Sequence, residues 1–286
     1  MIYGVTLGSG ELADMALCQL ESIHKFADIS EESIIANCPP SEWDRIDEAK
    51  REELRSLSTV TLKPLPVEDY PQSAFQATGL ACAEKVGSDD WFILLDTDTL
   101  VLDDLERDFD PKYALAAKPS DFHYERVGLS ENMVRNAFEI ANTSFPDYTC
   151  LSTVDKKPIP PYWNAGVVFV HDIEIVHWWI DLIKTLADEV SEGFFIDQLA
   201  LSILSDDYNT LALTEKTNFP LSQRLWTPSS TKVIHYHKPV ELRWVINPLI
   251  YRKIQQVKIN ERLGFGSFKC QIKRFGIRFA RLRLRK

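Results

Sequence analysis

The stretch DDWFILLDTDTLVLDDLE, residues 89–106, places a short apolar run directly before two carboxylates. Residues 91–95 are typical of a buried strand, and Asp96 and Asp98 follow it with one residue between them. Like charges at this spacing repel each other, so both stay ionised only beside a cation. The stretch therefore predicts either a metal site at a strand end or two solvated acids in a loop.

Strands and helices are expected to alternate along much of the chain. Apolar runs predict strands, and apolar residues spaced three and four apart predict helices. The expected strands are residues 2–7, 33–37, 60–65, 91–95 and 165–170, a short strand near 211, and 233–236. The expected helices are residues 11–26, 42–57, 72–86, 173–187 and 194–205. This order is typical of a mostly parallel α/β sheet, which binds ligands at the carboxyl ends of its strands.

One long segment interrupts the alternation. Residues 118–161 contain five prolines, and we expect irregular or locally helical chain there, as an insertion that covers a substrate.

The composition indicates a folded protein with a large core. The chain has 286 residues, 45% hydrophobic content and seven tryptophans. No apolar run approaches the roughly 18 residues that a membrane span needs. The N-terminus lacks the basic and long apolar regions of a signal peptide, so we expect a cytoplasmic protein. The five cysteines are scattered without a C-x-x-C pair, which predicts reduced and mostly buried thiols.

The charge is distributed unevenly. Residues 252–286 contain 12 of the 32 lysines and arginines but only one of the 42 acidic residues, Glu261. The acidic remainder argues against general nucleic-acid binding. In the tail, Phe268, Ile272, Phe275 and Phe279 share one face of a predicted helix whose other faces are basic. Such a helix suits an anionic membrane surface, the protein's own acidic body or a partner. We therefore expect a domain over residues 1–250 and a basic amphipathic tail over residues 251–286.

Four further segments accompany the D-x-D stretch. They are the first strand with Thr6, W-N-A-G at 163–166, F-I-D-Q at 195–198 and I-H-Y-H-K-P at 234–239. Together they resemble the GT-A-fold glycosyltransferases, most closely the retaining glycosyltransferase family 8. The resemblance covers roughly residues 1–245. It implies a Rossmann-like mixed, mostly parallel sheet flanked by helices, to which the basic helical tail would be attached.

The resemblance implies a metal site for Mn²⁺ or Mg²⁺. Asp96, Asp98 and His235 would be its ligands. Carboxylate oxygens with one imidazole suit these cations. The cation would act as a Lewis acid on the diphosphate of a nucleotide-sugar, most simply a UDP-linked hexose. The other substrate would be a hydroxyl acceptor, either a glycan or a lipid-linked molecule.

The resemblance also assigns binding and catalytic roles. Asp197 would bond sugar hydroxyls, and Gln198 would lie near the anomeric carbon, on the face that the acceptor attacks with retention. The residues expected to contact the nucleotide or sugar are Thr6, Gln76, Asp96, Thr97, Asn164, Ala165, Gly166 and Lys238.

The chain departs from the family pattern at three places. Gln76 stands where the family usually has an arginine in the helix before D-x-D. The late segment is shorter and lacks its glycine, so His237 is an alternative metal ligand to His235. Leu199 follows the D-Q pair, where the family has a second aspartate.

Other classes of protein remain as alternatives. A haloacid dehalogenase-type phosphatase would use Asp96 as its nucleophile, but that family carries its D-x-D on the first strand. A nucleotidyltransferase would want a basic, glycine-rich N-terminal loop, and residues 8–11 read G-S-G-E. A third alternative is a non-catalytic module that binds a nucleotide-sugar.

Overall fold

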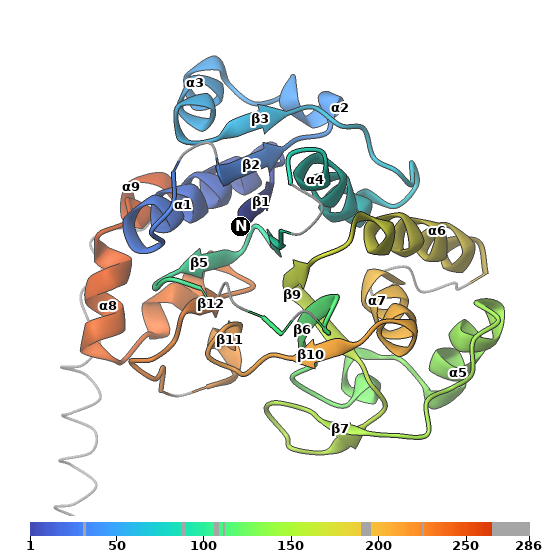
Figure 1. Ribbon diagram of the computed structural model, residues 1–286. Helices are drawn as coiled ribbons and strands as arrows, with labels where there is room; N and C mark the ends of the chain where they lie inside the picture. Colours follow the sequence, from blue (N-terminus) through green and yellow to red (C-terminus); the bar gives the residue numbers. More distant parts are fainter. Residues whose placement is uncertain are drawn as a thin grey trace, which may run out of the picture.

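The computed structural model describes residues 1–30, 33–86, 90–105, 109–110, 112–189, 196–224 and 226–264. Across these residues a seven-stranded sheet forms the centre of the protein (Figure 1). Its strands are, in spatial order, β10 (Thr210–Ala212), β6 (Leu115–Pro119), β9 (Trp163–Val170), β4 (Phe92–Leu95), β1 (Ile2–Thr6), β2 (Ile34–Asn37) and β3 (Thr59–Thr61). Only β9 runs antiparallel to its neighbours in this sheet. The expected mixed, mostly parallel α/β sheet is confirmed.

Helices cover both faces of the sheet because the strand residues alternate between two cores. Phe92 and Leu94 of β4 belong to one core, and Ile93 and Leu95 belong to the other. Helices α4 (Ala74–Ala83), α6 (Ile173–Glu189) and α7 (Ile196–Asp207) pack on the first face, with α5 (Glu131–Ile140) beyond them. Helices α1 (Glu11–Phe26) and α3 (Glu48–Leu57) pack on the second. This burial on both faces explains the continuous apolar run of residues 91–95.

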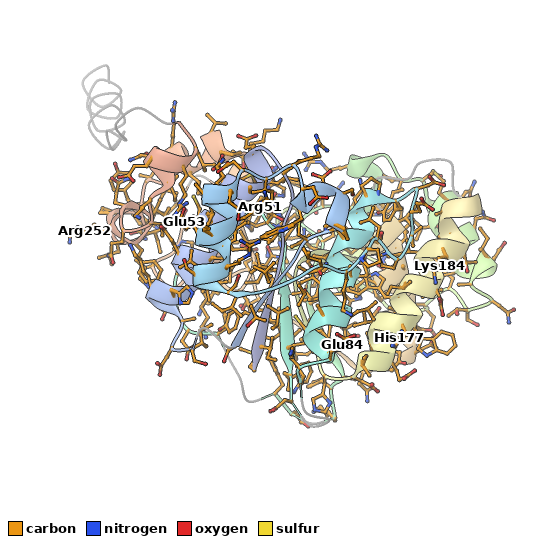
Figure 2. The ribbon with its side chains drawn as sticks, turned by 90° about the horizontal axis from the view of Figure 1, so that it is seen from above. Arg51, Glu53, Glu84, His177, Lys184 and Arg252 are labelled. Atoms are coloured by element: carbon orange, nitrogen blue, oxygen red, sulfur yellow. The ribbon has the colours of Figure 1, made fainter. Side chains whose placement is uncertain are left out.

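Helix α6 shows how the periodicity of the sequence positions the outer layer. Val176, Trp179 and Ile183 are buried against the sheet side. His177 and Lys184 are exposed on the outer surface, where Figure 2 shows them beside α4. An apolar stripe of this kind anchors a helix on a sheet.

A smaller sheet and the last helices close the carboxyl edge. Strand β12 (Val233–His235) pairs antiparallel with β5 (Thr99–Val101) and parallel with β11 (Phe219–Pro220). Helices α8 (Pro248–Gln255) and α9 (Ile259–Arg262) join the core beneath this sheet and lie beside α1 (Figure 1). Helix α8 runs across residues 250 and 251, where we expected the tail to begin. The remaining elements are α2 (Pro40–Trp43), the hairpin of β7 (Cys150–Leu151) and β8 (Pro158–Ile159), and 3₁₀ helices at Pro71–Ser73, Tyr124–Val127, Leu221–Gln223 and Pro239–Trp244.

Several expected elements differ from the structure. The helix expected over 42–57 is two helices, because Asp47 caps α3 by accepting a hydrogen bond from the Lys50 amide. The strand expected over 60–65 spans only Thr59–Thr61. The segment 118–161, expected to be irregular or locally helical, contains the helix α5 but also the end of β6 and the strands β7 and β8. Strands β5, β6 and β11 were not expected. The amphipathic helix expected from Phe268 lies outside the described residues.

Two expectations drawn from composition can be compared with the structure. Cys18, Cys38 and Cys82 are buried free thiols and Cys150 is a half-buried one, which agrees with the prediction, while Cys270 is not described. In the described part of the chain, no helix combines the length and apolarity that crossing a bilayer requires.

Candidate active site

The turn after β4 is held by hydrogen bonds to the main chain of Asp96. The Asp96 amide donates to the Gly166 carbonyl oxygen at 3.0 Å, across the β4–β9 edge. The Asp96 carbonyl oxygen accepts from Gln19 Nε2 at 2.7 Å and from Thr99 Oγ1 at 2.8 Å. The Asp96 side chain accepts one hydrogen bond, from the Thr97 amide to Oδ1 at 2.9 Å. Its Oδ2 atom, 4.0 Å from His235 Nε2, remains available for a ligand.

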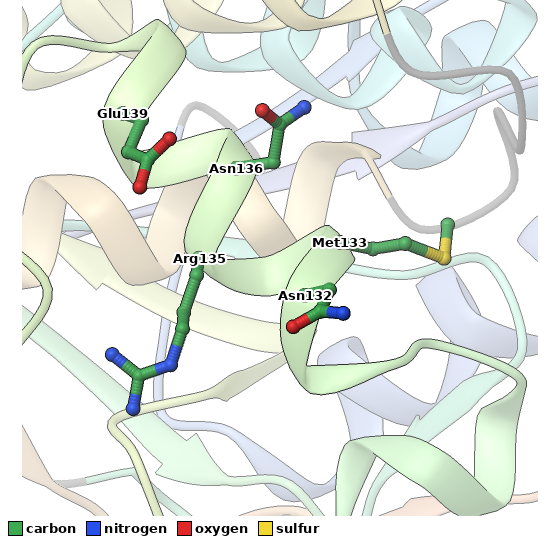
Figure 3. A pocket seen from close by; sticks show the side chains of 5 residues that line it. All are labelled: Asn132, Met133, Arg135, Asn136 and Glu139. Carbon is green, nitrogen blue, oxygen red and sulfur yellow. The ribbon is translucent and has the colours of Figure 1, made fainter.

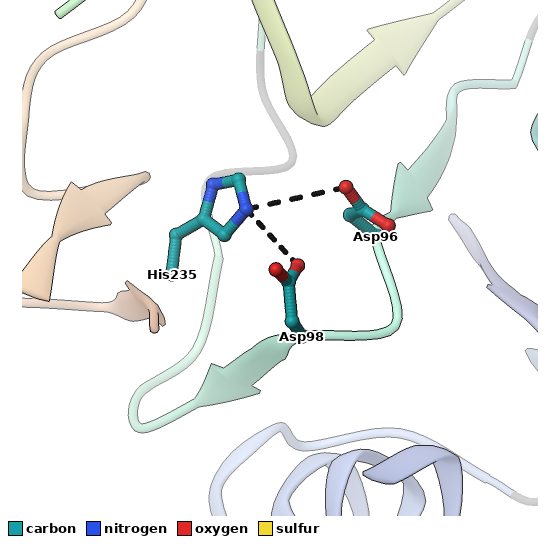
Figure 4. A group of neighbouring side chains, drawn as sticks. All are labelled: Asp96, Asp98 and His235. Carbon is teal, nitrogen blue, oxygen red and sulfur yellow. Dashed lines mark ion pairs between the residues drawn. The ribbon is translucent and has the colours of Figure 1, made fainter. Parts of the chain in front are cut away.

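Asp96, Asp98 and His235 converge at this turn (Figure 4). His235 Nε2 lies 3.0 Å from Asp98 Oδ1 and 4.0 Å from Asp96 Oδ2. One ligand atom from each residue lies within 4.8 Å of the others. Two carboxylates and one imidazole at this spacing fit a divalent cation such as Mn²⁺ or Mg²⁺. Asp98 Oδ1 and His235 also face each other inside the protein, so a cation would replace a buried ion pair rather than attach to a surface.

The charges of the three residues are coupled. Burial would raise the pKa of Asp98, but the charge and hydrogen bond of His235 outweigh it and hold that pKa below its usual value. Burial would lower the pKa of His235, but Asp98 outweighs it and raises that pKa. The pKa of Asp96 is raised to about 7, first by burial and then by the negative charge of Asp98. Half of the Asp96 side chain is still open to solvent, at 50% relative exposure, so an ion can reach it.

The N-A-G segment lies against the metal-site histidine. Asn164 Oδ1 accepts from the Gly166 amide at 2.9 Å and from Asn218 Nδ2 at 2.7 Å. Asn218 Oδ1 lies 3.2 Å from His235 Nδ1. Gly166 is required at its position, because a Cβ there would lie 2.4 Å from His235 Nδ1.

Asp197 is held by a tyrosine that the sequence did not single out. The Tyr70 hydroxyl donates to Asp197 Oδ1 at 3.1 Å and accepts from the Asp197 amide at 3.2 Å. Trp179 Nε1 donates to the Asp197 carbonyl oxygen at 2.8 Å. Burial raises the pKa of Asp197 to about 6, and the charge of Asp197 in turn raises the pKa of Asp96. The carboxylate of Asp197 therefore acts on the metal turn electrostatically. Gln198 is half-buried at the start of α7.

Two of the expected contact residues bond each other near the acidic turn. Thr97 Oγ1 donates to the Thr6 carbonyl oxygen at 2.9 Å, and Thr6 Oγ1 lies 2.9 Å from Thr78 Oγ1. Gln76 on α4 is fully buried, and neither of its amide atoms has a hydrogen-bond partner.

The segment after β12 surrounds His235. The His237 ring stacks on the His235 ring with centroids 4.2 Å apart. His237 has a positive φ of 48°, a conformation that is costly outside glycine and tends to occur at functional sites. Glu241, which the sequence did not single out, is buried with its Oε2 3.9 Å from His237 Nδ1. Lys238 is exposed beside them. The structure thus places His235, and not His237, in the group with both aspartates.

A surface depression elsewhere is separate from these residues. It is lined by Asn132, Met133, Arg135, Asn136 and Glu139, all from α5 (Figure 3). None of the expected site residues lines it, so the active site is assigned to the strand ends and not to this depression.

A mixed, mostly parallel sheet with an acidic turn and a histidine at one strand end is a GT-A-like arrangement. Residues 5–208 match the Rhodobacterales glycosyltransferase domain, and the chain belongs to that family and is a glycosyltransferase. This assignment sets aside the phosphatase and nucleotidyltransferase alternatives. No curated protein is similar enough in sequence to match the chain.

Solved structures of glycosyltransferases share the fold. The galactosyltransferase LgtC, in complex with donor and acceptor sugar analogues, is 16% identical and has a TM-score of 0.53, with 92% of this chain and 95% of LgtC covered. An active-site mutant of LgtC gives a TM-score of 0.54 at the same identity and coverage.

Proposed function

We propose that this glycosyltransferase is metal-dependent and transfers a hexose from a nucleotide-diphosphate sugar, UDP-linked, to a hydroxyl acceptor. The observation that carries the proposal is the convergence of Asp96, Asp98 and His235 at the carboxyl end of β4. Ligands bind at such strand ends in α/β sheets. Bound there, Mn²⁺ or Mg²⁺ would supply Lewis-acid stabilisation of the diphosphate leaving group.

The protein side chains have distinct roles in this proposal. Asp197, held by Tyr70, accepts hydrogen bonds from sugar hydroxyls. Asn164, Ala165 and Gly166 form the wall of the sugar pocket. Lys238 offers its positive charge to the diphosphate.

The remaining residues orient the donor for attack. Gln198 lies near the anomeric carbon on the face that the acceptor hydroxyl approaches, which corresponds to retention of configuration. Thr6, Thr97 and Gln76 contact the nucleotide or the sugar. The fold of LgtC, solved with donor and acceptor sugar analogues, supports a donor and an acceptor as the two substrates.

A donor screen tests the proposal. Thermal unfolding is followed with UDP-, GDP- and dTDP-hexoses, each with and without Mn²⁺. We expect the largest rise in Tm with a UDP-hexose and Mn²⁺ together, because a ligand that binds only the folded state stabilises it. The anomeric configuration of the product, read by NMR, tests retention. A metal-independent response to every donor would contradict the proposal.

The basic tail is proposed to hold the enzyme at the cytoplasmic face of an anionic membrane, where a lipid-linked acceptor would be found. The basic and apolar residues of 265–286 support this idea. Sedimentation with anionic vesicles tests it on the full chain and on a version that ends at Gly264, since α9 before that residue packs on the body. Equal sedimentation of the two proteins would remove the idea.

A further inference from the structure

Three amides link the metal-site histidine to the strand that would contact the sugar. The Gly166 amide and Asn218 Nδ2 both donate to Asn164 Oδ1, at 2.9 and 2.7 Å. Asn218 Oδ1 then faces His235 Nδ1 at 3.2 Å. Asn218 comes just before β11, far along the sequence from β9. The sequence predicts it neither as a metal ligand nor as a residue that contacts the nucleotide or sugar.

The Gly166 backbone amide sets the donor and the acceptor of every hydrogen bond in this series. The Gly166 N–H can only donate, so the atom that it faces must be the oxygen of Asn164. Asn218 must therefore present its NH₂ group to that oxygen, which turns its own oxygen toward His235. An oxygen at that place accepts only from a protonated Nδ1. The second nitrogen, Nε2, is thereby left to face Asp98 and Asp96.

We infer that Asn218 is a positioning residue that fixes the ring orientation and tautomer of His235 for cation binding. The inference rests on the proposed metal-dependent function. Metal-binding histidines usually donate their other ring N–H to an oxygen, and loss of that oxygen weakens metal binding. The surrounding structure leaves little freedom, because Asn218 is fully buried and His235 is only 5% exposed. A flipped Asn218 amide would place its NH₂ group against the Nδ1 proton and leave buried groups without partners.

These hydrogen bonds also connect the proposed sugar pocket to the proposed metal site. Asn164 belongs to the N-A-G segment, and its oxygen is the acceptor that orients Asn218. Changes at Asn164 should therefore alter cation binding, although a second amide stands between its side chain and His235.

Titration of the sugar-nucleotide-free protein with Mn²⁺, followed by electron paramagnetic resonance, measures cation affinity without any assay of activity. Asn218→Leu removes the oxygen that faces His235, and we expect Mn²⁺ affinity to fall roughly 10- to 100-fold. Asn218→Asp keeps an oxygen there, and we expect its affinity to exceed that of Asn218→Leu by at least about tenfold. Asn164→Ala should give a smaller loss, and the double variant Asn164→Ala, Asn218→Leu should lose no more than Asn218→Leu alone, because both act through one chain.

Asn247→Leu is the matched control. Asn247 is 3% exposed and uses its side chain to bond Thr227 and Leu249, away from the three metal-site residues. We expect it to lower Tm without changing Mn²⁺ affinity. If Asn218→Leu does not fold, Asn218→Asp and Asn164→Ala are compared with the wild type to test the role of Asn218. Both should lower the Mn²⁺ affinity by less than tenfold, while Asn247→Leu leaves it unchanged.

Asp98→Asn separates this inference from the proposed function. Equal Mn²⁺ affinity of Asp98→Asn and the wild type would overturn the metal site itself. Loss of binding in Asp98→Asn with unchanged binding in Asn218→Leu would overturn the role of Asn218 alone. Equal losses in Asn218→Leu and Asn218→Asp would show that the packing of Asn218, and not its oxygen, supports His235.

Discussion

His235 lies directly across from Thr99 in the antiparallel pairing of β12 with β5, and its Nε2 atom therefore reaches Asp98 Oδ1 at 3.0 Å. His235 follows Asp98 by 137 residues in the sequence. Pairing of two very short strands, and not proximity along the chain, builds the group. The smaller sheet thus brings His235 to the D-x-D turn and completes the candidate metal site.

Asp98→Asn tests the group directly. The substitution keeps the size of the side chain and removes its charge, so we expect metal-dependent turnover to fall by more than about 100-fold while Tm changes little. Initial rates at a series of Mn²⁺ concentrations measure this effect. Asp103→Asn is the matched control, because Asp103 is an exposed aspartate a few residues away that bonds Lys253 at 3.3 Å. Unchanged turnover in Asp98→Asn would contradict the assignment.

Gly166→Ala tests how tightly the strand packs on the histidine. The added Cβ would lie 2.4 Å from His235 Nδ1 and 2.5 Å from its Cε1, and atoms cannot approach that closely. We expect His235 to move. Mn²⁺-dependent turnover should then fall by about 10-fold or more, which is the usual effect when a metal ligand loses the contacts that hold it in position. Gly79→Ala is the control, since its Cβ would meet Val176 and Leu94 at 3.1 and 3.3 Å inside α4, away from the metal group. Activity of Gly166→Ala equal to that of Gly79→Ala would show that the histidine position is not needed.

The sequence predicted six of the seven strands of the central sheet, because their apolar runs are a local signal, but it did not predict β6. The run before Asp96 is apolar at every position, since both faces of β4 are covered by helices. Strands β5 and β11 were not predicted, because they contain only two or three residues each and pair with distant partners, whereas β12 was expected. The break between α2 and α3 was missed because the helical pattern of the sequence is continuous there. Asp47 interrupts it by capping the start of α3.

The site was predictable only where its residues lie in motifs. Asp96, Asp98 and His235 were selected by their place in the D-x-D and late segments, and the structure brings these three together. Tyr70, Asn218 and Glu241 act through contacts made in the folded state, and they lie in segments with no periodicity or motif of their own. A buried polar residue next to a short strand, as Asn218 is to β11, is the only sequence signal that could have pointed to one of them.

Tyr70→Phe tests the support of Asp197. An ionised Asp197 accepts hydrogen bonds from a sugar more strongly than a protonated one, so turnover should fall as the pH drops through about 6, the value to which burial raises its pKa. The hydrogen bond from Tyr70 lowers that pKa, so its removal should raise it further. We therefore expect the acidic limb of the rate profile to move to higher pH in Tyr70→Phe, at saturating Mn²⁺. Tyr148→Phe is the control, because Tyr148 is 48% exposed. Superimposable profiles of Tyr70→Phe and the wild type would contradict the role of the tyrosine.

Arg262→Met tests what holds the last helices on the body. Arg262 bonds Glu21 and Glu53, each at 2.6 Å, and its side chain is only 8% exposed. Removing one partner of a largely buried ion group leaves an uncompensated carboxylate, so we expect a loss of roughly 2 to 3 kcal/mol in the free energy of unfolding, because Glu53 is partly solvated. Chemical denaturation measures this loss. Arg252→Met is the control, since Arg252 is exposed at the edge of the protein (Figure 2).

The same group sets an acid dependence of stability. The hydrogen bond from Arg262 holds the pKa of Glu53 below its usual value. A carboxylate with a depressed pKa in the folded state stabilises it above the unfolded pKa of about 4.3, and this contribution is lost as the pH falls through the folded value. The wild type should therefore lose more stability than Arg262→Met between about pH 5 and pH 3. Parallel acid curves for the two proteins would contradict the coupling.

Gln76→Leu tests whether a buried amide without partners is kept for a ligand. Gln76 is fully buried and neither of its amide atoms is bonded, so the folded protein bears the desolvation cost of that group. Leucine has a similar volume and no polar atoms, and we expect it to raise the free energy of unfolding by about 1 kcal/mol. If the amide contacts the donor, the same substitution should weaken donor binding, measured by the donor-dependent rise in Tm. Gln19→Leu is the contrasting variant, because Gln19 Nε2 bonds the Asp96 carbonyl oxygen at 2.7 Å and Thr99 Oγ1 at 2.6 Å, and its loss should lower stability. Stability gained together with donor binding lost is the pattern of a residue retained for function, whereas stability gained with unchanged donor binding would remove Gln76 from the site.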